Sequence, residues 1–326
     1  MRLKHRLYLG LKTAKSNIPL LRRVRLLKMA PPVVHYGRHK ILEATAGNQL
    51  LLDRVGSDRP IAAGKIGDCE LETLVKYEAA AGDLEAFFHS ISKAGHELDL
   101  LYVNTGVFPK SADAIASWAE AYLQSLRYLD LIGVWYNAGE EEILEKYAPQ
   151  AILSRVRALE PYYHDHPWSK ALKGTRTLVV TSFPDTVRRQ RRLYRGADLF
   201  ANNPDVFPDF ELETVRSPFS PALVPPLHTT WHEALSSMED QIRRTVFDVC
   251  LVGAGAYSLP LCAFVRSELG QTAIHLGGAV QVLFGMKGKR WDGNAAISGF
   301  YNDAWTRPLP TERPKGTWRV EGSAYW

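Results

Sequence analysis

The sequence predicts an α/β fold in which helices cover both faces of a mainly parallel sheet. Short apolar runs alternate with segments of helical periodicity, as in Val249-Cys250-Leu251-Val252 ahead of the helical stretch 259–269. Strands that are apolar on both faces are typical of parallel sheets buried between two helical layers. The chain has 326 residues, 46% of them hydrophobic, which is enough to bury a full core.

The expected elements follow one another as strand–loop–helix units, which predicts a Rossmann-like domain. The expected strands are 61–66, 131–135, 177–182, 247–252 and 273–276, and the expected helices are 41–55, 71–78, 111–126, 231–243 and 259–269, with a further basic helix opened by Pro184. Ser111 has the character of a helix N-cap. The proline-rich residues 203–228 predict an irregular connection with one short strand near 210–212.

A basic arm precedes this domain. Residues 1–42 contain eleven lysines and arginines and no acid, so the rest of the chain is net negative although the whole chain carries +5. We divide the chain into an arm over residues 1–40 and a domain over residues 41–326. Within residues 1–28, leucines recur at helical spacing among the basic residues, which predicts two short amphipathic helices.

Three interpretations of the arm remain open. It could lie on an anionic membrane surface, pack on the acidic domain, or bind a partner subunit in a homo-oligomer. Nucleic acid is a poorer partner, because the acidic domain offers no second basic face. No apolar run approaches the roughly 20 residues that a membrane span needs. The N-terminus lacks the features of a secretory signal, so we expect a cytoplasmic protein, peripheral on the inner face of the membrane if the arm binds lipid.

The cysteines and histidines give no metal framework. Cys69, Cys250 and Cys262 form no CxxC pair, which argues against disulfides and against a thiolate zinc site. The run Tyr163-His164-Asp165-His166 matches no standard zinc spacing and is more typical of a loop with solvent-facing imidazoles.

The first candidate site follows the strand 61–66. Asp68 and Glu70 stand one residue apart where a strand ends and a helix begins. In an extended turn, side chains at i and i+2 point the same way, and two carboxylates on one side suit Mg²⁺ or Mn²⁺ bound to a diphosphate. The alternative is an acidic helix N-terminus, in which Asp68 caps and Glu70 favours the positive end of the helix dipole.

Three further loops follow later strands and could contact phosphates. Gly253, Gly255 and Ser258 lie in a turn whose amides could approach a phosphate, although the turn lacks a full dinucleotide fingerprint and could be a tight turn only. The loop Ser182-Phe183-Pro184-Asp185 precedes a helix that carries Arg189, a candidate phosphate clamp. Gly277 and Gly278 precede a polar loop with Gln281 and Lys287, which could cover a pocket or be an ordinary basic turn.

Taken in order, these segments resemble the GT-D fold glycosyltransferases and their bacterial relatives over residues 50–326. The blocks that carry the resemblance are Lys65-Ile66-Gly67-Asp68-Cys69-Glu70, Gly106-Val107-Phe108-Pro109, Ile132-Gly133-Val134-Trp135, Ser182-Phe183-Pro184-Asp185-Thr186, Val252-Gly253-Ala254-Gly255, Leu276-Gly277-Gly278-Ala279 and the tail Val320-Glu321-Gly322-Ser323-Ala324-Tyr325-Trp326. The first block is similar to an R-x-G-D-G-E segment whose D-x-E carries the metal. Gly277-Gly278 stands where characterised glucosyltransferases of that fold have Gly-His, so the donor sugar stays open.

The resemblance implies a hexosyltransferase that takes a sugar from a nucleotide donor, usually a UDP-sugar, to a glycan, lipid-linked or protein acceptor, as in polysaccharide biosynthesis. It implies Mn²⁺ or Mg²⁺ at Asp68 and Glu70, and a nucleotide held by the glycine loops with Arg189. Asp185 is the candidate general base. Two other classes remain open: a Rossmann enzyme that uses NAD or S-adenosylmethionine, and a non-catalytic sugar-nucleotide-binding protein.

Overall fold

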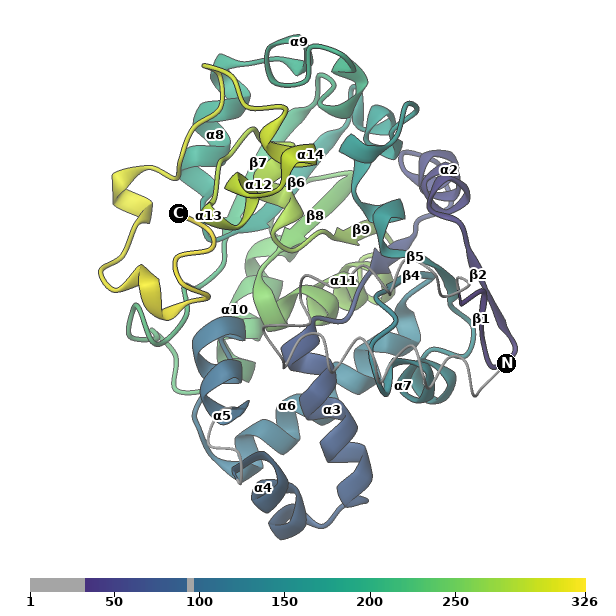
Figure 1. The fold of residues 1–326 in the computed structure, drawn as a ribbon, viewed down its shortest axis with the longest axis vertical. Coiled ribbons are helices and arrows are strands. Elements are labelled where there is room, and N and C mark those ends of the chain that lie inside the picture. The colour runs from purple at the N-terminus through teal and green to yellow at the C-terminus, as the bar shows by residue number, and fades with distance from the viewer. Residues whose placement is uncertain (1–32, 93–96) are drawn as a thin grey trace.

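The computed structural model describes residues 33–92 and 97–326. Its centre is a nine-stranded sheet with the order β1-β2-β5-β4-β3-β9-β8-β6-β7 (Figure 1). The strands are β1 (His35–Tyr36), β2 (His39–Leu42), β3 (Ala62–Gly64), β4 (Leu131–Val134), β5 (Ile152–Arg155), β6 (Arg176–Thr181), β7 (Glu211–Arg216), β8 (Val249–Gly253) and β9 (Thr272–His275). Only the β1–β2 pairing is antiparallel among these strands, and every other neighbouring pair is parallel.

Helices cover both faces of the sheet. One face packs against α3 (Asp68–Ala80), α4 (Leu84–Ser92), α6 (Ala112–Ser125), α7 (Glu140–Tyr147), α10 (Trp231–Arg243) and α11 (Ser258–Ser267), with α5 (Glu97–Leu100) beside them. The other packs against α2 (Ala44–Arg54), α8 (Pro184–Leu193), α9 (Gly196–Leu199), α12 (Ala279–Leu283) and the C-terminal segment with α13 (Lys289–Asp292) and α14 (Ala295–Ser298). Neighbouring strand residues alternate between the two cores, since Val180 belongs to the first and Val179 to the second.

The predicted fold class is confirmed. The five expected strands are β4, β3, β9, β8 and β6, and they lie side by side in the middle of the parallel sheet. The predicted cap is also confirmed, because the Ser111 hydroxyl accepts a hydrogen bond from the backbone N–H of Ala114.

The sequence analysis missed the strands β1, β2 and β5 and predicted the edge strand β7 too short. Expected helix 41–55 begins only at Ala44, because Ile41 and Leu42 pair with β5 instead. Strand β7 runs for six residues along β6 and is longer than expected. It is an edge strand with the sequence ELETVR, and such charged strands lack the apolar pattern that predicts buried ones.

The basic arm is described only from residue 33 onward. Residues 33–40 contain β1 and the first half of β2, so the boundary that we placed between residues 40 and 41 cuts through a strand of the sheet. The two helices expected within residues 1–28 lie outside the described residues. In the described part of the chain, no helix has the length and apolar character to cross a membrane.

Candidate active site

A cavity of about 600 Å³ lies at the carboxyl ends of the parallel strands. Segments that follow β3, β4, β5, β6, β8 and β9 all line it, as expected for a ligand site in an open α/β sheet. Nine of the candidate residues from the sequence are on its wall: Lys65, Gly67, Asp68, Glu70, Ser182, Gly253, Gly255, Gly277 and Gly278. The sheet topology thus brings together loops that are up to 213 residues apart in the chain, from Lys65 to Gly278.

The two carboxylates of the D-x-E segment both line the cavity, although not by the geometry that we expected. They lie in the first turn of α3, where i and i+2 side chains do not face each other. Glu70 instead folds back over Gly67, whose position would place a Cβ atom only 2.1 Å from a Glu70 carboxylate oxygen. Asp68 is exposed and accepts a hydrogen bond from the Asn137 side chain.

Burial raises the pKa of Glu70 to about 7, and the negative charges of Asp68 and Glu321 act in the same direction. A cation bound beside Glu70 would favour its ionised carboxylate over the neutral acid. The residues around Glu70 therefore fit a divalent ion by charge. Within the described ranges, no group of three or more His, Cys, Asp or Glu side chains could hold a metal. An ion at Asp68 and Glu70 would need further ligands from a bound molecule or water.

Two basic side chains occupy the cavity wall beside the D-x-E segment. Burial lowers the pKa of Lys65, an effect that Glu160 and Asp68 oppose, and its ammonium lies 5.1 Å from the Trp135 ring centroid. Burial and the charge of Lys65 lower the pKa of His275 to about 3, so its imidazole is neutral at physiological pH. The Lys65 side chain thus lies within the electrostatic reach of the Glu160 and Asp68 carboxylates on this wall.

Arg157 and Glu160 are cavity residues that the sequence analysis did not single out. They lie after β5, and an Arg157 Nη1 to Glu160 Oε2 distance of 2.9 Å joins them in an ion pair. The Arg157 guanidinium lies 3.9 Å from the Tyr163 ring centroid. The sequence of β5, Ile-Leu-Ser-Arg, is too short and polar to predict a strand, so nothing in the sequence marks Arg157 and Glu160 as residues at a strand end.

The glycine turns hold the cavity loops close together. Gly255 has φ of +55°, and a Cβ there would lie 2.7 Å from the Thr105 carbonyl oxygen. A Cβ on Gly253 would lie 2.7 Å from the Gly277 carbonyl oxygen. Ser258 is fully buried and accepts a hydrogen bond from the backbone N–H of Ala254, so it supports the turn from within and does not line the cavity.

The N-terminus of α8 is occupied by a carboxylate of the chain itself. Buried Glu312 accepts hydrogen bonds from the backbone N–H groups of Asp185 and Thr186, at 2.8 and 2.9 Å. These amides are therefore taken, and a ligand phosphate cannot bind them as the loop Ser182–Asp185 suggested.

Three other candidate residues also lie away from the cavity wall. Asp185 pairs with Arg188 and Arg216 at 2.7 and 2.6 Å; these contacts outweigh burial and lower the pKa of its carboxyl. Asp185 does not line the cavity, which removes the geometric basis for its role as general base. Arg189 is exposed on α8, and Lys287 lies 5.3 Å from the Tyr301 ring centroid, also off the cavity wall.

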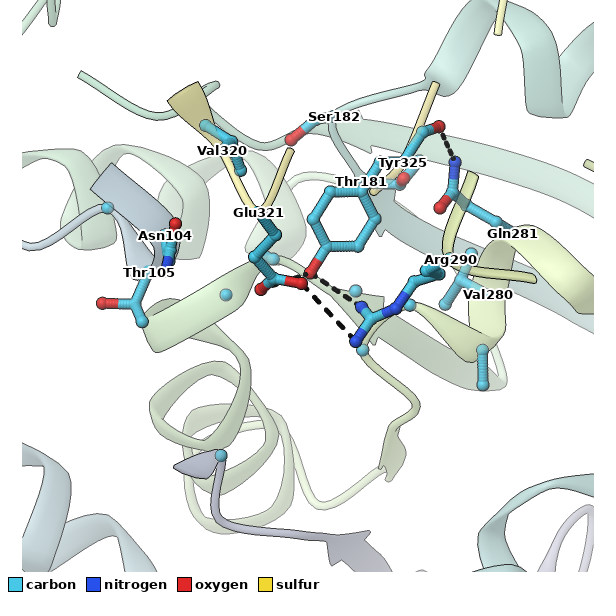
Figure 2. Close-up of a pocket in the computed structure, with 18 of the residues that line it drawn as sticks. Asn104, Thr105, Thr181, Ser182, Val280, Gln281, Arg290, Val320, Glu321 and Tyr325 are labelled. Carbon is cyan, nitrogen blue, oxygen red and sulfur yellow. Dashed lines mark hydrogen bonds and ion pairs between the residues drawn. The ribbon is translucent and has the colours of Figure 1, made fainter. Parts of the chain in front are cut away.

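The C-terminal segment supplies a wall of the cavity that the sequence analysis did not assign. We call Arg290, Trp291, Glu321 and Tyr325 the C-terminal wall. Figure 2 shows Arg290, Glu321 and Tyr325 pointing toward one another. The Gln281 side-chain amide donates a hydrogen bond to the Tyr325 carbonyl oxygen. Only two sequence signals pointed here: the basic loop after Gly278 and the tail of the family resemblance.

The histidines after Tyr163 have different surroundings in the structure. His164 is buried, contrary to the expectation of solvent-facing imidazoles, and its Nε2 lies 2.9 Å from the Arg157 carbonyl oxygen. Asp165 and His166 are exposed. His164 thus supports the loop that carries Arg157.

Comparison with known proteins identifies no family. No family model matches the chain, and no curated protein matches it. One solved structure, described as domain of unknown function 1792 with selenomethionine, aligns over 85% of this chain and 94% of its own. Its sequence identity of 13% and TM-score of 0.40 are too low for this similarity to support any argument about fold or function.

Proposed function

We propose that the protein is a metal-dependent glycosyltransferase that uses a nucleotide-sugar donor. One observation carries the proposal: carboxylates and cations line the same cavity at the carboxyl edge of the sheet, with Asp68 and Glu70 beside Lys65. A nucleoside diphosphate bound with a divalent ion needs both charges, because the carboxylates bind the ion and the cations offset the phosphates. The order of sequence blocks described above agrees with this class.

The cavity volume is consistent with such a donor. Small-molecule sites commonly measure about 300–1,000 Å³, and this cavity measures about 600 Å³. Its wall also contains a cluster of aromatic side chains, Phe183, Phe219 and Trp326, which pack on one another. A ligand with both charged and planar or apolar parts matches this lining better than a small inorganic anion.

The proposed chemistry assigns separate tasks to the chain's own residues. Asp68 and Glu70 would hold Mn²⁺ or Mg²⁺, which when bound supplies positive charge to the leaving diphosphate. Lys65 offsets negative charge on the same ligand, and neutral His275 keeps a second positive charge from accumulating beside it. An acceptor hydroxyl, from a glycan, a lipid-linked glycan or a protein, attacks the anomeric carbon of the donor. The bond from that carbon to the diphosphate breaks, the nucleoside diphosphate leaves, and the hydroxyl proton passes to solvent.

A thermal-shift screen tests the proposal against its alternatives. Protein is heated with UDP-glucose, GDP-mannose, NAD or S-adenosylmethionine, each with and without Mn²⁺. We expect a nucleotide sugar to raise the melting temperature in the presence of Mn²⁺ only. Stabilisation by NAD or S-adenosylmethionine without metal would instead favour the nucleotide-dependent Rossmann enzymes. Binding of a nucleotide sugar without turnover of any acceptor would favour a binding protein.

A further inference from the structure

The C-terminal wall combines a carboxylate, a guanidinium and a phenol in one network. Arg290 Nη1 donates to the Tyr325 hydroxyl at 3.0 Å, and Arg290 Nη2 lies 3.5 Å from a Glu321 carboxylate oxygen. The Tyr325 hydroxyl donates to Glu321 at 3.4 Å (Figure 2). The guanidinium also lies 5.0 Å from the Trp291 ring centroid. The wall therefore presents hydrogen-bond acceptors, donors and aromatic surface together.

Two buried polar atoms beside this network have no hydrogen-bond partner among the described residues. They are Gln281 Oε1, an acceptor, and Trp291 Nε1, a donor. Gln281 is 3% exposed, and its amide nitrogen is already used by the Tyr325 carbonyl oxygen at 2.9 Å. A buried polar group without a partner costs about 1–3 kcal/mol. A ligand that both donates and accepts hydrogen bonds at this place would remove that cost.

Gly278 lies against three side chains of the C-terminal wall. A Cβ on Gly278 would lie 3.3 Å from Arg290 Nη1, 3.3 Å from Trp291 Cζ2 and 3.4 Å from Tyr325 Cε1. Its φ of −61° is one that alanine adopts without strain. The glycine therefore lets three side chains of the C-terminal wall approach the backbone closely, and a methyl group there would push them apart.

We propose that the C-terminal wall, Gln281 and Gly278 form the subsite for the sugar of the nucleotide-sugar donor. Sugar hydroxyls donate to a carboxylate and accept from a guanidinium, and the C–H face of the ring packs on aromatic side chains. A phosphate fits less well, because Arg290, the cation of this wall, is already paired with Glu321 and Tyr325. The inference rests on the proposed function, since it assumes that the nucleotide binds elsewhere in the same cavity.

Isothermal titration with matched ligands tests this subsite. The probes are UDP, UDP-glucose, UDP-galactose, UDP-N-acetylglucosamine, GDP and GDP-mannose, each with Mn²⁺. The variants are Glu321→Gln, which removes the charge, and Gly278→Ala, whose methyl group displaces the side chains of the C-terminal wall. The matched controls are Glu268→Gln on the exposed end of α11 and Gly293→Ala, where an added Cβ meets nothing within 4 Å. Circular dichroism checks that each variant is folded.

We expect each of the two variants to weaken the tightest nucleotide sugar by on the order of tenfold and to leave the parent nucleoside diphosphate within about twofold. The controls should leave both affinities unchanged. Equal weakening of nucleotide and nucleotide sugar, or no weakening of either, would overturn the subsite while the proposed function stands. A wild-type protein that binds none of the six probes would overturn the proposed function and the subsite with it.

Discussion

Glu312 offers a direct test of how the C-terminal segment is attached to the fold. Its carboxylate is fully buried and accepts hydrogen bonds from the backbone N–H groups of Asp185 and Thr186 and from the Thr186 hydroxyl. The substitution Glu312→Ala would leave these donors without a partner. Each buried unpaired group costs about 1–3 kcal/mol, so the free energy of unfolding should fall by about 3–5 kcal/mol.

Urea unfolding followed by tryptophan fluorescence measures this change. The control is Glu268→Ala, whose exposed side chain should contribute less than about 0.5 kcal/mol. Glu312→Gln keeps the volume but turns an NH₂ group toward backbone donors, so we expect an intermediate loss. A loss below about 1 kcal/mol for Glu312→Ala would show that other contacts cap α8 and would refute the reasoning.

Three other predictions follow from the site and the arm. Asp68→Ala should abolish the Mn²⁺-dependent thermal shift with a nucleotide sugar and leave the fold intact. The exposed control Asp58→Ala should behave as wild type. An unchanged metal dependence for Asp68→Ala would contradict the metal assignment. Because the pKa of Glu70 rises from 4.5 to about 7 on folding, its stabilising contribution is full below pH 4.5 and is lost as the pH rises through 7. Relative to Glu70→Gln, the wild-type free energy of unfolding should therefore fall by about 3 kcal/mol between pH 4.5 and 8, and parallel pH profiles would exclude this. If residues 1–28 bind membranes, full-length protein should sediment with anionic vesicles at low salt more than a protein that begins at Tyr36, and equal recovery would exclude a membrane role.

The sequence predicted the centre of the sheet because burial leaves a clear pattern there. The neighbours Leu251 and Val252 are both apolar although they point to opposite faces of the sheet, and Gly253 marks the end of their strand. The margins carry no such pattern. Strand β5 begins with Ile152, which is 42% exposed, and ends in a polar Ser-Arg pair, so it resembles a loop.

The cavity was predicted less completely than the fold. Loops that follow predicted strands can be identified from the sequence. Asp68, Glu70 and Gly278 lie in or beside such loops, and all three line the cavity. Glu321 and Tyr325 could not be placed by this rule, because they follow no strand and reach the cavity only through tertiary contacts such as those of Glu312. Asp185 follows a strand, yet the arginines beside it turn its carboxylate toward the surface.

The pairing of β3 with β9 has a consequence for how binding and folding are coupled. These adjacent strands are far apart in the chain, since the Ile61 amide donates to Thr272, 211 residues away. Contacts of such long sequence separation form late and slowly when a chain folds. Asp68 follows β3, and Gly277 follows β9. A ligand that contacts both residues would stabilise the pairing of β3 with β9. Such a ligand should therefore slow unfolding as well as raise the free energy of unfolding.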